Sequence, residues 1–385
     1  MTGAAPRTVL VAPDSFKGSL TSVQVARALA DGWRRARPDD EILLCPLADG
    51  GEGTLAAIEA AGGWLRQTVE VSDPLSRSIA AAWLRSDDGT RAVIEMAEAS
   101  GLSRVAPAER DAGQATSHGT GGLITAALDE GVRVITLGIG GSATTDGGQG
   151  ILDALGVVAR EWDGDQMTPG GEYLGRLRSV DVGGLDPRLG EIRLEVACDV
   201  SNPLLGPTGA AAVYGPQKGA SPQLVEELDA GLAHWADLLD AATGRAERLT
   251  PGAGAAGGVG FALLSIQDRF RSFALRPGID LVMDATEFQD RLGRADLVIT
   301  GEGRIDAQTA FGKTALGVAR RAQAAGVPCV AVGGGVEPDG IDALAEVGAV
   351  AVPVVERPQT VEEAMAAGTA PVIRCGERLA RLIMW

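Results

Sequence analysis

Short apolar runs rich in β-branched residues recur along this chain, and each is followed by a polar loop, usually rich in glycine, and a helix. Two such runs, Thr8–Pro13 and Glu41–Leu47, lie near the amino terminus. Three more, Leu297–Thr300, Pro328–Val332 and Ala349–Val354, lie near the carboxyl terminus. Strands that alternate with helices form parallel sheets. We therefore expect one open parallel sheet of five strands, split by an insertion, with a final helix from about residue 360 to the end.

The middle of the chain has a different pattern. Gln67–Val71 and Ser78–Leu84 predict a hairpin about Asp73-Pro74, and Arg91–Met96 predicts a third strand. Helix-forming and strand-forming stretches then alternate, which favours a mixed sheet with its own helices. Further predicted elements here are a helix over Gly119–Glu130, strands over Val132–Gly138 and Glu195–Cys198, and an amphipathic helix over Ser221–Ala242.

Composition narrows the classes of partner. The chain has 385 residues, enough for two domains, and a formal net charge of −17, which argues against nucleic acid or an anionic membrane surface as a partner. Its four cysteines are far apart and form no CxxC pair, as expected in a reducing compartment. The first residues lack a secretory pattern, and no apolar run is long enough to span a membrane. We expect a cytoplasmic protein.

Lysine is scarce in this chain. Only Lys17, Lys218 and Lys313 are lysines among 34 basic residues, and each lies next to a glycine. A compact ammonium group is not replaced by a broad guanidinium in a tight anion pocket. We therefore hypothesise that the three lysines mark anion sites; the alternative is three ordinary lysines retained by chance.

The stretch Ala295–Asp306 predicts a buried strand that ends at Thr300 in a glycine-rich turn carrying Glu302, Arg304 and Asp306. Strand, glycine loop and helix together aim backbone N–H groups at an anion, although glycines also serve simple turns. Several such loops with carboxylates and lysines supply the parts that phosphoryl transfer needs. No G-x-x-x-x-G-K-[ST] motif is present, and Asp306 at the last position of a G-x-G-x-x-G pattern disfavours a dehydrogenase.

These loops resemble the type I glycerate kinases, in order and over nearly the whole chain. The matching blocks are Asp14–Ser19, Ala48–Thr54, Gly138–Thr144, Asp199 with Asn202–Gly206, Tyr214–Ala220, and Thr300–Thr309 with Gly312-Lys313. Three positions depart from the family pattern: Thr145 stands where asparagine is common, His118 where an aromatic residue is common, and Gly122 where glutamate is common. A loop histidine at a helix start is most simply interpreted as exposed.

The resemblance implies the α/β fold class of that family. A flavodoxin-like domain with a parallel five-stranded sheet, residues 1–66 plus 290–385, is interrupted by an inserted α/β domain with a mixed sheet, residues 67–289, and the active site lies in the cleft between them. The implied activity is ATP-dependent phosphorylation of D-glycerate, giving 2-phosphoglycerate, with ATP and Mg²⁺ as cofactors. A kinase of another small sugar acid and a non-catalytic ligand sensor are the alternatives, and a homodimer is one open option for the assembly.

The resemblance and the loop chemistry assign candidate roles. Candidate catalytic residues are Lys17, Asp199 and Asn202, and candidate substrate-binding residues are Asp14, Ser15, Arg304 and Asp306. Candidate cofactor-binding residues are Gly140, Gly141, Ser142, Thr144, Asp146 and Lys313. Candidate metal ligands are Asp49, Glu52 and Glu302.

Simpler interpretations stay open for some of these side chains. Asp199 and Asn202 could instead form an Asx turn before Pro203. Glu52 could be an acidic residue that interacts favourably with the start of a helix. Which loop holds the nucleotide and which holds glycerate is left open.

Overall fold

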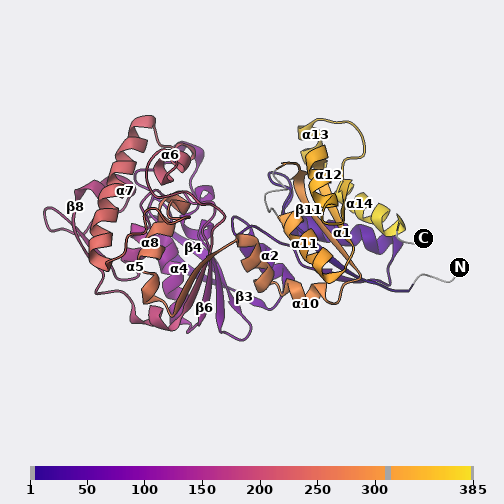
Figure 1. The fold of residues 1–385 in the computed structure, drawn as a ribbon, viewed down its shortest axis with the longest axis horizontal. Helices are drawn as coiled ribbons and strands as arrows, with labels where there is room; N and C mark the ends of the chain where they lie inside the picture. The colour runs from indigo at the N-terminus through magenta and orange to yellow at the C-terminus, as the bar shows by residue number, and fades with distance from the viewer. Residues whose placement is uncertain (1–4, 308–313, 383–385) are drawn as a thin grey trace. The chain divides into compact units, whose positions relative to one another are not determined.

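The computed structural model describes residues 5–307 and 314–382, and it divides into two compact units (Figure 1). Unit 1 comprises Met1–Asp49, Ala56–Gly62 and Ile279–Trp385, and unit 2 comprises Gly50–Leu55 and Gly63–Gly278. Each has its own sheet. The short segment Gly50–Leu55 belongs to unit 2 although unit 1 residues flank it on both sides.

Unit 1 is built on a five-stranded sheet with the order β13-β12-β11-β1-β2. Every neighbouring pair in it is parallel, which confirms the predicted parallel sheet assembled from both ends of the chain. Its strands are β1 (Thr8–Pro13), β2 (Glu41–Leu44), β11 (Leu297–Ile305), β12 (Cys329–Val336) and β13 (Ala349–Pro353).

The paired strands β11 and β12 are longer than the sequence predicted. The prediction that β11 ends at Thr300 in a glycine-rich turn is wrong, because pairing with β12 continues from Glu302 opposite Gly333 to Ile305 opposite Val336. The glycines serve close packing here: a Cβ on Gly301 would lie 2.4 Å from the Val332 carbonyl oxygen. Glycine within a strand marks such an approach of backbone.

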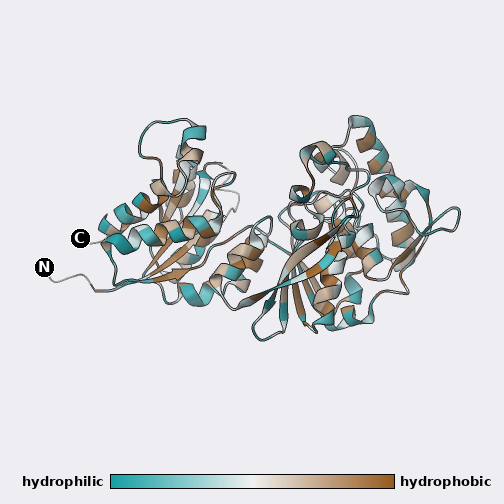
Figure 2. Ribbon diagram, turned by 180° about the vertical axis from the view of Figure 1, so that it is seen from behind, coloured by the Kyte–Doolittle hydropathy of each residue, from teal (hydrophilic) through white to brown (hydrophobic). Residues whose placement is uncertain are grey.

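Helices cover this sheet. One face packs against α1 and α14, where Val9, Val11 and Ile299 join side chains of both helices in one core cluster. In Figure 2 the strands of this sheet are mostly brown, whereas the surrounding helices carry teal stretches. The helices are α1 (Ser22–Ala36), α2 (Thr54–Ala61), α9 (Gly278–Ala285), α10 (Phe288–Leu292), α11 (Thr314–Ala325), α12 (Pro338–Ala345), α13 (Val361–Ala366) and α14 (Ala370–Leu382).

The prediction of a single helix at the carboxyl terminus is wrong. Two helices, α13 and α14, occupy this stretch, and Gly368 lies between them with a φ of 59°. A left-handed backbone conformation ends an α-helix, and glycine adopts it at little cost. Thr360 caps α13 in a capping box with Glu363, so this helix has its own start signal.

Unit 2 contains a six-stranded mixed sheet with the order β10-β9-β6-β5-β4-β3. The predicted hairpin is confirmed as the antiparallel pair β3 and β4, and the remaining core strands β5, β6, β9 and β10 run parallel. The strands are β3 (Trp64–Ser72), β4 (Ser78–Ser86), β5 (Arg91–Glu95), β6 (Val134–Gly138), β9 (Arg193–Ala197) and β10 (Ser272–Arg276), with a small separate hairpin of β7 (Val158–Glu161) and β8 (Leu177–Asp181).

The helices of unit 2 bury one continuous core. Leu228, Leu232 and Trp235 project from α7 into the cluster that also contains the strand residues Ile94 and Ile135. The amphipathic pattern predicted for this helix is therefore confirmed as a packing face. The helices are α3 (Ala97–Ser100), α4 (His118–Asp129), α5 (Gln149–Ala154), α6 (Ala210–Tyr214), α7 (Pro222–Thr243) and α8 (Val259–Ser265).

The contact between α1 and α14 generates a stability prediction. A Cβ on Gly32 of α1 would lie 1.9 Å from the carbonyl oxygen of Ile373 in α14, so Gly32→Ala must push the helices apart. We expect the free energy of unfolding to fall by about 1–3 kcal/mol. Urea unfolding followed by circular dichroism measures it.

Gly317→Ala in α11 is the matched control, because a Cβ there meets nothing closer than 3.7 Å. Removing a glycine from a helix interior should stabilise the protein by up to about 1 kcal/mol. Equal effects of the two substitutions would contradict the packing argument.

Candidate functional site

The carboxyl end of β1 presents Asp14 at the edge of the unit 1 sheet. Its carboxylate accepts hydrogen bonds of 2.6 Å from the Ser15 backbone N–H and of 2.6 Å from the Thr314 hydroxyl at the start of α11. Burial raises the pKa of Asp14, and the negative charge of Asp49 raises this pKa further. Asp14 and Asp49 thus lie near each other in the loops that follow the neighbouring strands β1 and β2, and Thr314 is a supporting residue that sequence reasoning missed.

Lys17 follows in the same loop, and its side chain is exposed. The loop lies close to β11, since a Cβ on Gly303 would be 3.1 Å from the Lys17 backbone nitrogen. It also touches α13, where the Met365 carbonyl oxygen accepts a 3.3 Å hydrogen bond from the Ser19 hydroxyl. An exposed ammonium group on a loop held from two sides is available to an anionic ligand.

The extended part of β11 carries two of the predicted residues, Glu302 and Arg304, and Asp306 follows directly after it. Glu302 is 7% exposed, whereas the Arg304 side chain is 67% exposed. The Arg304 guanidinium forms ion pairs with Glu337 and with Asp306, the latter at 3.4 Å. These acids hold the pKa of Arg304 above its ordinary value. The positive charge of Arg304 is therefore already balanced by these two carboxylates, and a substrate carboxylate would compete with Glu337 for the guanidinium.

In unit 2 the segment Gly50–Leu55, which carries Glu52, packs directly on the carboxyl end of β6. A Cβ on Gly138 would lie 2.5 Å from the Gly50 carbonyl oxygen, and one on Gly140 would lie 2.7 Å from the Gly51 Cα. Gly50 itself has a φ of 85°. Only glycines permit this approach, so two of the predicted glycine loops form one structure.

Glu95 anchors that segment, a role that sequence reasoning missed. The Glu95 carboxylate, at the end of β5 and 3% exposed, accepts hydrogen bonds from the backbone N–H groups of Gly53 at 3.0 Å and Leu55 at 3.1 Å. Burial raises the pKa of Glu95 to about 7 against these hydrogen bonds, and the charges of Glu98 and Glu52 add to the rise. The available signal in the sequence was a single acidic residue at the end of an apolar strand.

Most of the predicted cofactor loop is buried. Gly140 and Gly141 reach the surface, whereas Ser142 is 7% exposed and Thr144 and Asp146 are fully buried. A Cβ on Gly257 would lie 1.9 Å from the Thr144 carbonyl oxygen, so the far half of the loop is wedged against neighbouring backbone. Contact with a bound molecule is thus open to Gly140 and Gly141 first.

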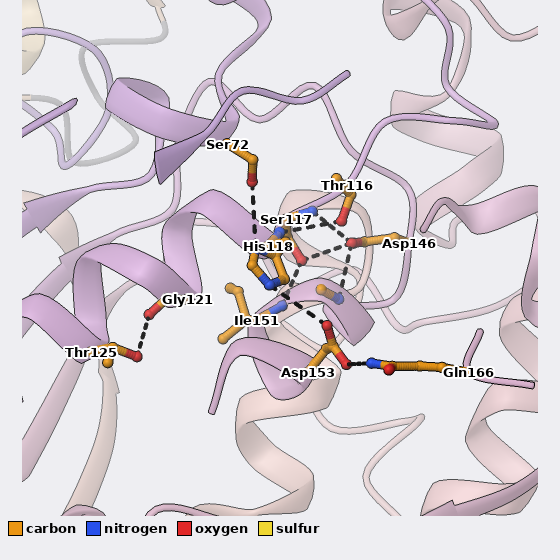
Figure 3. A network of polar contacts seen from close by, with 11 residues as sticks. Ser72, Thr116, Ser117, His118, Gly121, Thr125, Asp146, Ile151, Asp153 and Gln166 are labelled. Atoms are coloured by element: carbon orange, nitrogen blue, oxygen red, sulfur yellow. Dashed lines mark hydrogen bonds and ion pairs between the residues drawn. The ribbon is translucent and has the colours of Figure 1, made fainter. Parts of the chain in front are cut away.

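The Asp146 carboxylate organises two helix starts (Figure 3). It accepts 2.7 Å hydrogen bonds from both the backbone N–H and the hydroxyl of Ser117, which precedes α4. It also accepts from the N–H groups of Gly148 at 3.1 Å and Gly150 at 3.3 Å, where α5 begins. The geometry gives Asp146 a positioning role, and its predicted contact with a cofactor stays a prediction.

His118 lies beside this network and is half-exposed (Figure 3). Its Nε2 is 3.6 Å from an oxygen of Asp153, and its Nδ1 is 3.4 Å from the Ser72 hydroxyl. Thr145, another departure from the family pattern, is fully buried, and its hydroxyl has no hydrogen-bond partner among the described residues.

The lysine hypothesis meets different outcomes at its three positions. Lys17 is exposed, whereas Lys218 is 2% exposed and binds the predicted cofactor loop from inside unit 2. Lys313 lies outside the described residues. Lys218 is therefore a loop support in this structure and not a surface anion site.

Asp199 and Asn202 follow β9. Asp199 is exposed and accepts a 3.0 Å hydrogen bond from the Gly278 N–H. The Asn202 amide donates to the Thr208 carbonyl oxygen at 2.8 Å and accepts from the Tyr214 hydroxyl at 2.7 Å. Asn202 is thus fixed by Thr208 and by Tyr214 at the end of α6, and the catalytic roles of Asp199 and Asn202 stay predictions.

The predicted metal ligands fall in both units: Asp49 and Glu302 in unit 1 and Glu52 in unit 2. Within residues 5–307 and 314–382, no group of three or more His, Cys, Asp or Glu side chains is arranged to hold a metal ion. The three-residue metal set stays a prediction.

Comparison with known proteins assigns the chain to a family. The model of the glycerate kinase family matches residues 9–384. The chain belongs to the glycerate kinase family. It is 44% identical over 98% of both chains to a glycerate kinase of Halalkalibacterium halodurans, and 43% identical to the glycerate 2-kinase of Escherichia coli over 87% of this chain and 89% of that protein.

A solved structure agrees. The crystal structure of a putative glycerate kinase 2 from Salmonella typhimurium LT2 superposes with a TM-score of 0.86 at 43% identity and 98% coverage of both chains. The predicted glycerate kinase family, α/β fold class and kinase class of enzyme are thereby confirmed. None of the helices in the described part of this family member has the length and apolar character needed to cross a bilayer.

The buried Glu95 carboxyl predicts a pH dependence of stability. Its pKa of about 7 lies above its ordinary value, so the folded protein binds a proton that the unfolded chain releases. The resulting stabilisation is complete below about pH 4.5 and is lost as the pH rises through 7, by about 3 kcal/mol in total.

Urea unfolding of Glu95→Gln at pH 5, 6, 7 and 8 checks this, because the variant should lack that loss. Glu130→Gln, at an exposed acid of the same unit, should keep the wild-type slope. Parallel pH curves for wild type and Glu95→Gln would contradict the assignment.

Proposed function

We propose that this glycerate kinase family member transfers the terminal phosphoryl group of ATP to D-glycerate and gives 2-phosphoglycerate. The observation that carries the proposal is its 43% identity, over 87% of the chain, to a relative named glycerate 2-kinase. Similarity over nearly the full length of both proteins favours the same substrate. We place the reaction in the cytoplasm, where ATP is available and where the four free cysteines stay reduced.

The Asp14 region supports a role for a divalent cation. Burial and the Asp49 charge both disfavour the ionised form of Asp14, and a bound cation would reverse that balance. Carboxylate oxygens are ligands that Mg²⁺ prefers. A Mg²⁺–ATP complex would supply the transferable phosphoryl group together with partial neutralisation of its charge. In this proposal the predicted metal ligand Asp49 interacts with the cation, with Glu52 and Glu302 as further candidates. We add Asp14, which the sequence predicted to bind the substrate, as another ligand.

The exposed Lys17 is the proposed contact for the acid. Its ammonium group matches a substrate carboxylate or a transferred phosphoryl group, and the loop that carries it is fixed by β11 and α13. We propose that Gly140 and Gly141 supply backbone N–H groups to a bound anion, and that Asp199 accepts the proton of the reacting hydroxyl. The cleft between the two predicted domains, as the place where these groups meet, stays part of the proposal.

The activity is tested with purified protein, ATP, Mg²⁺ and D-glycerate. We expect release of ADP that depends on D-glycerate, with a product whose ³¹P spectrum matches authentic 2-phosphoglycerate. A 3-phosphoglycerate spectrum would correct the position of transfer. Faster ADP release with another small sugar acid would correct the substrate, and tight glycerate binding without ADP release would identify a sensor.

Lys17→Ala tests the proposed contact. Loss of one positioned charge of this kind lowers kcat/KM by roughly 100- to 1,000-fold. Arg27→Ala removes a positive charge from an exposed position in the following helix and should leave kcat/KM within about 2-fold of wild type. Near-normal kcat/KM for Lys17→Ala, measured by the same coupled assay, would remove Lys17 from the mechanism.

A further inference from the structure

Lys218 is a charged side chain in the interior of unit 2. It ends a short turn of helix, Pro216–Lys218, and only 2% of its surface is exposed. Its Nζ donates a hydrogen bond of 2.9 Å to the Ser142 hydroxyl and one of 2.5 Å to the Thr144 carbonyl oxygen. Both acceptors belong to the loop that brings Gly140 and Gly141 to the surface. Lys218 therefore contacts the inner side of that loop.

The surroundings of the ammonium group are mostly apolar. Leu75, Leu102 and Val105 lie around Lys218, together with Arg110 and Asp111. Burial lowers the pKa of Lys218 to about 7, and the opposite charge of Asp146 counteracts this. An ammonium group in such a place is costly, and an apolar side chain of the same length would pack at no electrostatic cost. Stability alone therefore gives no reason for a lysine here.

The two hydrogen bonds give the lysine a use. They fix the residues on either side of Ala143, and the next residues, Thr145 and Asp146, are held by the wedged backbone of Gly257 and by Ser117. On the other side, Gly140 rests on Gly51. Without Lys218, the stretch from Gly141 to Thr144 would lose the hydrogen bonds to the Ser142 hydroxyl and the Thr144 carbonyl oxygen, and it would keep the backbone hydrogen bonds of Gly141 with Leu102 and of Ala143 with Ser100.

We propose that Lys218 is a positioning residue of this enzyme, which holds Ser142 and Thr144 so that Gly140 and Gly141 present one fixed backbone shape to the phosphate or substrate. This rests on the proposed function insofar as that loop contacts the reactants. Lys218 acts through the loop and does not touch the reactants, because its side chain is buried. A misplacement of about 1 Å at such a contact can cost roughly 100-fold in rate.

Lys218→Met tests the proposal, because methionine keeps the stem and loses the donor. We expect kcat to fall roughly 10- to 100-fold, with circular dichroism unchanged. Backbone amides from Gly140 to Thr144 should exchange hydrogen at least about tenfold faster than in wild type, and those of β10 should be unaffected. Gln217→Met, at the exposed neighbouring residue, is the matched control and should match wild type in both measurements.

The Ser142→Ala variant separates this role from general core packing. If Lys218 acts through Ser142 and Thr144, the double variant Lys218→Met with Ser142→Ala has the same kcat as Lys218→Met alone. Independent, multiplying effects would overturn the proposal, as would unchanged kcat and unchanged amide exchange in Lys218→Met.

Two outcomes need a second readout. Should Lys218→Met be recovered unfolded, Ser142→Ala alone must still speed amide exchange at Gly140 and Gly141, and unchanged exchange would overturn the proposal. Should the wild-type protein fail to phosphorylate D-glycerate, the proposed function fails, and the exchange comparison of wild type with Lys218→Met still decides whether Lys218 holds the loop.

Discussion

Direct backbone contact between two glycine loops is the constraint on which the candidate site of unit 2 depends. The segment after β2 lies on the carboxyl end of β6, where a side chain on Gly138 or Gly140 would collide with Gly50 and Gly51. This contact leaves no room for side chains and so fixes the two loops as one body. Glu95 completes it with two hydrogen bonds to the N–H groups of the arriving segment.

Buried ionisable groups surround that body, and each is satisfied differently. Asp146 is held by four hydrogen bonds from two helix starts, Glu95 by two backbone N–H groups, and Lys218 by a hydroxyl and a carbonyl oxygen. Burying charge in this way costs stability unless every partner is present. Such an arrangement specifies one loop conformation, which suits a site that must hold its reactants in register.

Most of the fold could be predicted from the sequence, but less of the candidate site. Short apolar runs rich in β-branched residues, with the glycine loops after them, predicted the parallel sheet, and local patterns likewise predicted the hairpin and the amphipathic face of α7. The extension of β11 past Thr300 was missed, because Gly301 and Gly303 are typical of turns. Only the pairing with β12 shows that they lie within a strand. Gly368 between α13 and α14 was likewise overlooked as a helix stop.

Burial separates the predicted site residues into exposed and enclosed ones. Thr144 and Asp146 have the composition of a ligand loop, yet they lie in the core because Gly257 and Ser117 arrive from distant parts of the chain. Glu95 and Thr314 matter through tertiary contacts with Leu55 and Asp14, and no local motif announces such contacts. Family resemblance supplied the activity class, and side-chain geometry supplied the division between exposed and supporting residues.

The scarcity of lysine has a practical consequence. Of the two lysines whose surroundings the structure describes, Lys17 is open to solvent and Lys218 is enclosed. An amine-directed label or cross-linker would thus react with Lys17, in the same loop as Asp14, and hardly with the enclosed Lys218. Lys313 and the terminal amine are the remaining sites of attachment. A fluorophore placed on Lys17 without any engineered cysteine would report on whatever occupies the loop after β1.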